Sequence, residues 1–218
     1  MAGDMKKKIV ALAVILLGVA ALAWSAPTVE PGILFGMNLS KLSGQVFGMD
    51  WKAKSGFTVG AVLTFSLADL FAIQPGIFYG QKGGIHEEPY EEGKLRAAMR
   101  LSYFDFPVVA RLSLPLGAEA KFRPYILGGI GASLKMGAKL RTEYIDEYEL
   151  ENLIDESTVK GLKAFGTFLV FGAGFNYMIS DYRLVFEVRS SRSLSTISSE
   201  GLDLKLGVLA ILIGVSFR

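Results

Sequence analysis

Alternation between apolar and polar residues at every second position runs through most of the chain. A clear example is residues 103–112. There, Phe104 and Phe106 fall on one face of an extended chain, whereas Asp105 and Arg111 fall on the other. A period of two over about ten residues is typical of a β-strand. An apolar face opposite a face with charged residues is unusual for a soluble sandwich. It suits a membrane barrel, which has lipid outside and a polar lumen inside.

Eight such runs can be placed, and the connections between them alternate between long and short. The expected strands cover approximately residues 33–40, 57–67, 71–82, 99–113, 123–135, 165–178, 182–189 and 202–217. Outer-membrane barrels have an even number of strands, short periplasmic turns and longer external loops. The sequence therefore predicts an all-β fold, an eight-stranded antiparallel up-and-down transmembrane β-barrel, with both ends of the chain in the periplasm.

Four long connections would lie outside the cell, namely residues 41–56, 83–95, 137–163 and 190–201. Within the third, residues 143–156 carry seven carboxylates and no Lys or Arg. Such density could bind divalent cations, although it lacks the spacing of a calcium loop. The interspersed Tyr, Leu and Ile could instead pack over the barrel mouth or extend the strands. We favour a third interpretation, a solvated charged face.

The final run changes parity near Gly207. Leu204 and Leu206 are on the opposite parity from Leu209 and the apolar residues that follow it. One extra residue in a strand reverses the facing of everything beyond it, so a bulge near Gly207 would realign the two parts. Alternatively, residues 202–206 lie above the membrane. The sequence leaves both alternatives open.

The first 25 residues have the pattern of a secretory signal peptide. Three lysines precede an apolar run at residues 9–24, and small residues follow it. We expect cleavage after Ser25, with Ala26 as the alternative, which leaves residues 26–218 as one outer-membrane β-barrel domain. An uncleaved anchor is the other interpretation, although the apolar run is shorter than the roughly 20 residues that a helical span needs.

The net charge and the cysteine content limit the classes of partner and cofactor that we expect for the chain. Of 23 basic and 21 acidic residues, removal of residues 1–25 takes away three lysines and Asp4, which leaves 20 of each. A formally neutral chain gives no indication of a nucleic-acid partner. The absence of cysteine excludes disulfides, thiolate metal sites and a cysteine nucleophile. We expect no cofactor and a monomer whose partners are outer-membrane lipid and, during insertion, the barrel-assembly machinery. A protein partner cannot be identified from the sequence.

Seven charged side chains are expected on the lumen face. Eight strands enclose a lumen that side chains fill, and buried charges there must pair. We therefore interpret these residues as a structural network without a catalytic, cofactor-binding or metal role. Many of the 25 glycines lie inside the strands, where they leave room for large lumen side chains. The lumen set is Lys82, Asp105, Arg111, Lys135, Arg183, Glu187 and Arg189. The residues expected to face lipid are Phe104, Phe106, Val108, Leu184, Phe186, Val188, Ile211, Ile213, Val215 and Phe217.

His86 is the only histidine and lies beside Glu87 and Glu88. One histidine cannot form a typical metal site, and no serine lies near it in a triad pattern. A barrel enzyme would need a histidine or carboxylate cluster at the outer rim, for which these three residues are the only candidates. We interpret His86 as a solvated loop residue and expect no enzymatic activity.

Five segments, taken in order, carry a resemblance to a known family. They are GMNLSKLSG, GFTVGAVLTFSLADLFAIQPGIFYGQKG, LSYFDFPVVARL, RPYILGGIGASL and FGAGFNYMI, spread over residues 36–217. Together they resemble the PorT-like outer-membrane β-barrel family of diderm bacteria, which implies an eight-stranded barrel in the outer membrane. The founding member is associated with secretion-system assembly. The chain departs from the family at Gly76, where relatives often have a lumen carboxylate, and at its end, Phe217-Arg218.

The sequence thus predicts an outer-membrane protein with a structural or surface-interaction role, in which a rigid barrel displays four external loops. The alternative is an accessory or assembly component of a secretion system. Less favoured hypotheses are a barrel enzyme that acts on lipid or peptide and a soluble periplasmic barrel that carries a ligand.

Overall fold

The computed structural model describes residues 28–44, 51–90, 93–116, 120–146, 151–159, 161–199 and 204–217. The expected signal peptide, residues 1–25, lies outside the described residues. No helix within the described ranges is long and apolar enough to cross a membrane.

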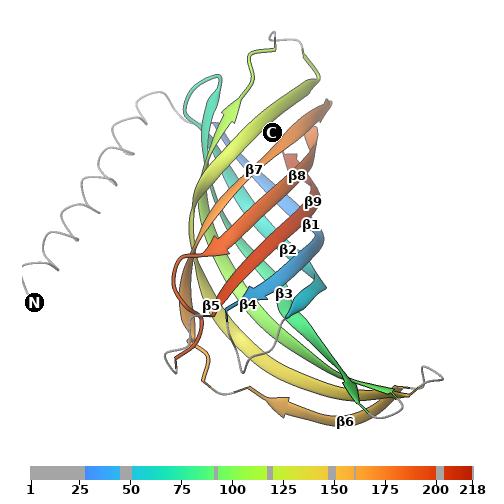
Figure 1. Ribbon diagram of the computed structural model, residues 1–218. Helices are drawn as coiled ribbons and strands as arrows, with labels where there is room; N and C mark the ends of the chain where they lie inside the picture. Colours follow the sequence, from blue (N-terminus) through green and yellow to red (C-terminus); the bar gives the residue numbers. More distant parts are fainter. Residues whose placement is uncertain are drawn as a thin grey trace, which may run out of the picture.

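Nine strands form one antiparallel sheet in the described part of the chain. They are β1 (Thr28–Ser43), β2 (Lys52–Ser66), β3 (Phe71–Tyr90), β4 (Gly93–Ser113), β5 (Phe122–Asp146), β6 (Glu151–Thr158), β7 (Phe165–Ile179), β8 (Tyr182–Ser193) and β9 (Lys205–Phe217). The sheet order is β4-β3-β2-β1-β9-β8-β7-β5-β6, and β4 also pairs with β5, so that eight strands close into a ring (Figure 1). The predicted eight-stranded antiparallel barrel is confirmed. The ninth strand, β6, pairs only with the far part of β5.

The ring closes between its first and last strands. β1 pairs with β9 without a register shift, from Gly32 opposite Ser216 to Ser43 opposite Lys205. The bulge considered near Gly207 is therefore absent. Leu204 and Leu206 are buried on the same face of β9 as the lumen residues that follow, while Leu202 lies outside the described residues. The alternation of faces along β9 is therefore unbroken. Leucines occupy lumen positions here because the lumen is apolar at this end.

The expected external loops are largely strand. β3 continues to Tyr90 and β4 begins at Gly93, and β5 continues to Asp146 before β6 pairs back onto it. Strand residues also occupy parts of the other two expected loops. Beyond the membrane both faces of a sheet can meet water, so the apolar alternation stops while the backbone hydrogen bonding continues. The prediction of loops at 41–56, 83–95, 137–163 and 190–201 is therefore wrong in part, since each range contains strand residues.

The two ends of the ring differ in form. Short turns join β2 to β3 and β7 to β8 at one end, near the end of β9. At the other end β3, β4, β5 and β6 project beyond the rest of the ring, as Figure 1 shows. We call this projecting part the extension. β5 has 25 residues and β8 only 12, whereas a membrane strand needs about 9–11.

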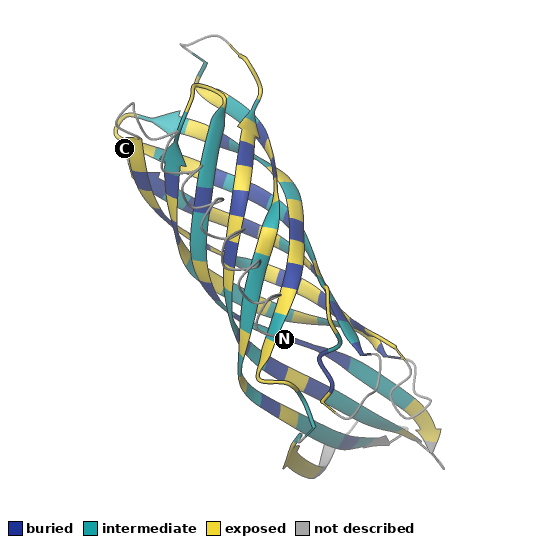
Figure 2. Ribbon diagram, turned by 90° about the vertical axis from the view of Figure 1, so that its left-hand side faces the viewer, coloured by how far each residue is buried: buried dark blue, intermediate teal, exposed yellow. Residues whose placement is uncertain are grey.

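The outer face of the ring is apolar. Burial alternates along each strand, which Figure 2 shows as successive bands of buried and exposed residues. Large apolar side chains remain more than half exposed on several strands, including Met37, Ile130 and Phe171. Soluble monomers rarely expose a continuous apolar surface of this kind. The outer face therefore has the chemistry of a lipid-facing wall.

Two inward-facing glycines make room for two buried phenylalanines. A Cβ atom at Gly60 would lie 2.3 Å from Cδ1 of Phe78, and one at Gly131 would lie 2.2 Å from Cζ of Phe168. Both rings are buried in the lumen. These glycines therefore admit large aromatic side chains into a narrow barrel.

A methyl group at Gly131 should therefore force the Phe168 ring to move. We expect Gly131→Ala to lower the free energy of unfolding by about 1–3 kcal/mol, the usual cost of overpacking. Gly166→Ala is the matched control, since a Cβ at Gly166 meets no atom within 4 Å. Urea unfolding in lipid vesicles, followed by heat-modifiable gel mobility, measures both variants. Equal stability of the two would contradict the packing argument.

Candidate functional site

Glu187 is the centre of a buried network in the middle of the lumen. Its side chain is 0% exposed. One carboxylate oxygen accepts a hydrogen bond from the Tyr125 hydroxyl at 2.6 Å, and the other accepts one from Nε of Arg189 at 2.5 Å. Arg189 also donates to Oε1 of Gln74 at 3.1 Å, and its guanidinium lies 5.0 Å from the centre of the Phe78 ring. The network links β3, β5 and β8 across the barrel.

Arg111 extends this network toward the short turns. Its guanidinium lies over the Tyr125 ring, 3.7 Å from the centroid. It donates to Oδ1 of Asn176 at 3.3 Å and to the Thr64 hydroxyl at 3.5 Å. Gln74 donates to the same hydroxyl at 2.9 Å. Arg111 and Gln74 thus contact other side chains of the lumen, which is the arrangement of a packed interior.

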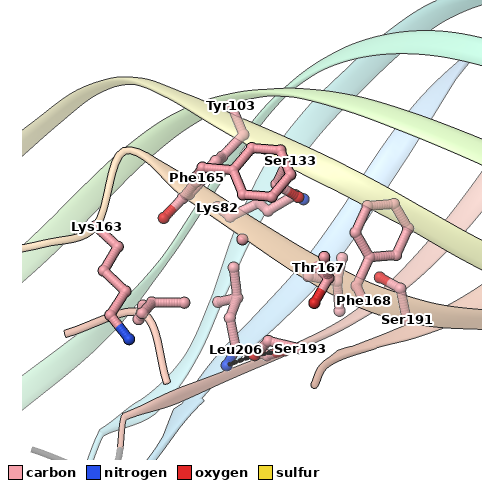
Figure 3. Close-up of a pocket in the computed structure, with 13 residues that line it drawn as sticks. Lys82, Tyr103, Ser133, Lys163, Phe165, Thr167, Phe168, Ser191, Ser193 and Leu206 are labelled. Carbon is pink, nitrogen blue, oxygen red and sulfur yellow. Dashed lines mark hydrogen bonds between the residues drawn. The ribbon is translucent and has the colours of Figure 1, made fainter. Parts of the chain in front are cut away.

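Lys82 and Asp105 form a second group. Lys82 donates to Oδ2 of Asp105, and the Ser133 hydroxyl donates to Oδ1 at 2.6 Å. The Lys82 ammonium also lies 5.3 Å from the centre of the Tyr103 ring and 5.9 Å from that of Phe168. Figure 3 shows Lys82, Tyr103, Ser133 and Phe168 around a cavity of about 30 Å³, which is enough for about one water molecule.

The remaining two lumen residues lie apart. Lys135 donates to the carbonyl of Leu162 at 2.6 Å, in the segment before β7. Arg183 donates to Glu30 at 2.5 Å, near the short turns. The seven predicted residues therefore form four separate groups and not one continuous network. Glu30 was missed because the first strand was expected to begin at residue 33. Extending the alternation back to Thr28 would have placed Glu30 in the lumen.

An apolar cluster fills the lumen at the extension end, which the sequence did not predict. Ile197, in the segment after β8, is buried in this cluster: its backbone NH donates to the carbonyl of Leu204 at 2.8 Å, and its own carbonyl accepts from the backbone NH of Lys163 at 2.8 Å. The cluster consists of Leu42, Trp51, Met99, Leu101, Tyr103, Ala138, Ile197, Leu204, Leu206 and Val208. The described segments thus close this end of the barrel with side chains.

The cavities of the lumen follow this division. A cavity in the middle, beside Lys82 and Asp105, has a volume of about 60 Å³. At the short-turn end an open cavity of about 640 Å³ is lined by Glu30, Arg111 and Arg183 among others. The interior formed by the described residues is therefore open toward the short turns and filled toward the extension.

His86 lies in β3, not in a loop, and its side chain is only 12% exposed. Nε2 is 2.8 Å from Oε1 of Glu88, and the ring centroid is 6.1 Å from that of Trp51. Glu87 accepts a hydrogen bond from Lys52 at 2.7 Å, which lowers the pKa of its carboxyl group. Among the described residues, no group of His, Asp and Glu is placed to hold a metal ion. The interpretation of His86 as a solvated loop residue was wrong.

The acidic segment 143–156 is partly paired with basic residues. Glu143 is buried and contacts Arg141, with Arg96 3.9 Å away. Glu156 is 2.7 Å from Lys139, and this hydrogen bond lowers the pKa of Glu156. The buried Glu143 departs from the interpretation of the segment as a solvated face, whereas Asp155 and Glu156 are exposed, as that interpretation predicts. The side chains of residues 145–154 lie outside what the structure describes.

The ten residues expected to face lipid all lie on the outer wall. Val108, Ile211 and Phe217 are about half exposed, at 51%, 51% and 50%. Phe186 is less exposed because its ring stacks on Phe175, with centroids 5.3 Å apart. Phe106, Leu184 and Ile213 are exposed, and Phe104, Val188 and Val215 are half-buried.

The chain was compared with protein-family models, with curated proteins and with solved structures. The family model described as outer membrane protein beta-barrel domain matches residues 26–199. A search of curated proteins finds no match. Among solved structures, OprG from Pseudomonas aeruginosa is 15% identical with a TM-score of 0.47, covering 88% of this chain and 96% of that one. Neisserial surface protein A is 10% identical with a TM-score of 0.44, covering 86% and 96%. Ail from Yersinia pestis is 13% identical with a TM-score of 0.41, covering 86% and 98%. The chain belongs to the outer membrane protein beta-barrel domain family and is a protein of the outer membrane.

Proposed function

We propose that the protein is a non-enzymatic display protein, whose barrel holds the extension outside the cell for contact with other surface components. The observation that carries this proposal is the asymmetry of the ring. Three adjacent strands, β3, β4 and β5, have 20, 21 and 25 residues, about twice what the membrane requires. The surplus length forms an ordered sheet beyond the apolar band.

The filled interior supports the same proposal. Ion pairs and aromatic rings occupy the middle of the lumen, and the apolar cluster occupies the extension end. Open diffusion channels are built from about 16 strands or more. A barrel of eight strands with this interior serves better as a rigid anchor than as a conduit.

Single cysteines test the display proposal directly, because the natural chain has none. We expect Lys94→Cys, in the extension, to react with a membrane-impermeant maleimide on intact cells. Asp69→Cys, in the exposed turn between β2 and β3, should react only after the outer membrane is permeabilised. Labelling followed on a gel gives the result. The opposite pattern, with Asp69→Cys labelled on intact cells and Lys94→Cys protected, would overturn the display proposal.

A second candidate is an accessory of a secretion or assembly machine, the role suggested by the resemblance to the PorT-like family. The open cavity of about 640 Å³ at the short-turn end favours it, since charged side chains line a concave surface there. A periplasmic partner seated on this surface should be captured by a cysteine-directed crosslinker at Asp69→Cys. The absence of any such adduct would leave display as the better account.

A further inference from the structure

A cleft lined mainly by basic side chains opens on the outer wall of the extension. Met99 and Leu101 are buried in the apolar cluster, so Arg100 between them faces outward. Arg100 pairs with Gly83, and Cδ of Lys54 lies 3.4 Å from the position of a Cβ at Gly83. The cleft has a volume of about 190 Å³ and is lined by Lys54, Arg96, Ala98, Arg100, Lys139, Arg141, Glu143 and Glu156. We call it the basic cleft.

Positive charge is in excess in the basic cleft. Both carboxylates are engaged, Glu156 with Lys139 and Glu143 with Arg141. Among the described residues, no ion pair joins Lys54 or Arg100 to a carboxylate. The pKa of Lys54 is lowered, mainly by burial and to a smaller extent by repulsion from Arg100 and Arg96. Cations held together without a compensating anion indicate a site for one.

The basic cleft lies just beyond the apolar band of the outer wall. Arg100 is four residues past Phe104 on β4, and Lys139 is three residues past Met136, which is 56% exposed. At about 3.3 Å per residue and a strand tilt of about 40°, this is a rise of roughly 8–10 Å. Lipid head groups occupy roughly 5–8 Å on each side of the hydrocarbon core. The near edge of the basic cleft, formed by Arg100 and Lys139, is therefore at the outer boundary of the head-group layer.

We propose that the basic cleft binds the phosphate group of a phosphorylated lipid of the outer leaflet. A guanidinium offers two parallel hydrogen bonds to phosphate oxygens, and a lysine adds a compact charge. Ala98, which has a small side chain, lines the basic cleft between Arg96 and Arg100. Free phosphate shares this chemistry, but only a lipid could also lay its acyl chains on the apolar wall below. The proposal rests on the orientation given under the proposed function.

Two double variants, each without one lysine and one arginine, test the proposal. Lys54→Gln/Arg100→Gln removes the cations that lack a carboxylate. Lys163→Gln/Arg192→Gln is the matched control, since both residues are exposed and neither lines the basic cleft. Binding of a bisphosphorylated lipid A is measured in detergent micelles, with the same lipid after removal of its phosphates and with inorganic phosphate as competitor.

We expect the cleft variant to bind the phosphorylated lipid about tenfold or more weakly than the natural protein. The control variant should bind normally, and the dephosphorylated lipid should bind poorly to all forms. Ala98→Asp, which keeps every cation but places a carboxylate in the cleft, should also weaken binding. Heat-modifiable mobility verifies that each variant is folded.

Equal weakening in the cleft and control variants would overturn the proposal, because it would show only general attraction of charge. Unchanged binding after loss of the lipid phosphates would also overturn it. Complete displacement by millimolar inorganic phosphate would overturn the assignment to a lipid. Because micelles impose no orientation, a reversed topology in the cysteine experiment leaves these results interpretable on their own.

Discussion

Replacing Glu187 with Gln is expected to lower the free energy of unfolding by about 3–5 kcal/mol, the cost of breaking a buried ion pair. The substitution removes the only carboxylate that contacts Arg189 in the described structure, and it leaves one amide oxygen where two carboxylate oxygens accepted from Tyr125 and Arg189. Arg111, which lies over the same tyrosine ring, loses its nearby negative charge as well. Urea unfolding in lipid vesicles measures the loss.

Two further variants show whether the effect comes from an unpaired charge. Glu187→Gln/Arg189→Met removes both members of the pair and should cost less than Glu187→Gln alone, since no buried guanidinium is left without its carboxylate. Glu156→Gln, at the exposed pair with Lys139, should leave stability unchanged. A double variant that is less stable than Glu187→Gln would show that the stabilisation comes from packing instead.

Phe186→Arg is expected to prevent stable insertion of the barrel. Phe186 lies in the middle of β8 on the outer wall, opposite Phe175 on β7. A cationic side chain on the lipid face near the bilayer midplane costs about 2–4 kcal/mol. Loss of the stacked ring pair adds about 0.5–1.5 kcal/mol. The measurement is the fraction of protein that reaches the heat-modifiable, protease-resistant form in vesicles.

Ser195→Arg is the control for this prediction. Ser195 is exposed in the segment between β8 and β9. Its neighbour Thr196 is unsuitable, because the Thr196 hydroxyl accepts hydrogen bonds from the backbone NH groups of Ser198 and Leu204. Normal insertion of Phe186→Arg would show that this face of β8 does not meet lipid.

The ring could be predicted from the sequence because lipid and lumen impose opposite chemistry on alternate residues. That rule alone predicts that the side chains of Glu187 and Arg189 lie in the lumen. The same alternation puts Gln74, Thr64 and Asn176 on the lumen face, but nothing in the sequence identifies them as hydrogen-bond partners of the charged residues. The sequence predicted one network of lumen charges, whereas the structure has four separate groups. Alternation predicts which face of the strand a residue occupies, but not its height along the barrel axis.

The extension and the apolar cluster were missed for related reasons. Above the membrane both sides of a sheet can be polar, so β3 to β6 lose the signal that identified the ring. The leucines at 204 and 206 appeared to be out of phase because the lumen was assumed to be polar along its whole length. In fact it changes from charged to apolar toward the extension, and β9 needs no bulge.

The seam between β1 and β9 has a consequence for biogenesis. The backbone groups on one edge of β1 are paired by β9, which is synthesised long after β1, and Glu30 contacts Arg183 across 153 residues of chain. Until that strand arrives, a lipid environment would surround unpaired backbone groups, which hydrocarbon does not tolerate. Contacts of such long sequence separation also form slowly. We therefore expect the ring to close only after β9 has been synthesised, which makes closure a late event in the folding of this chain.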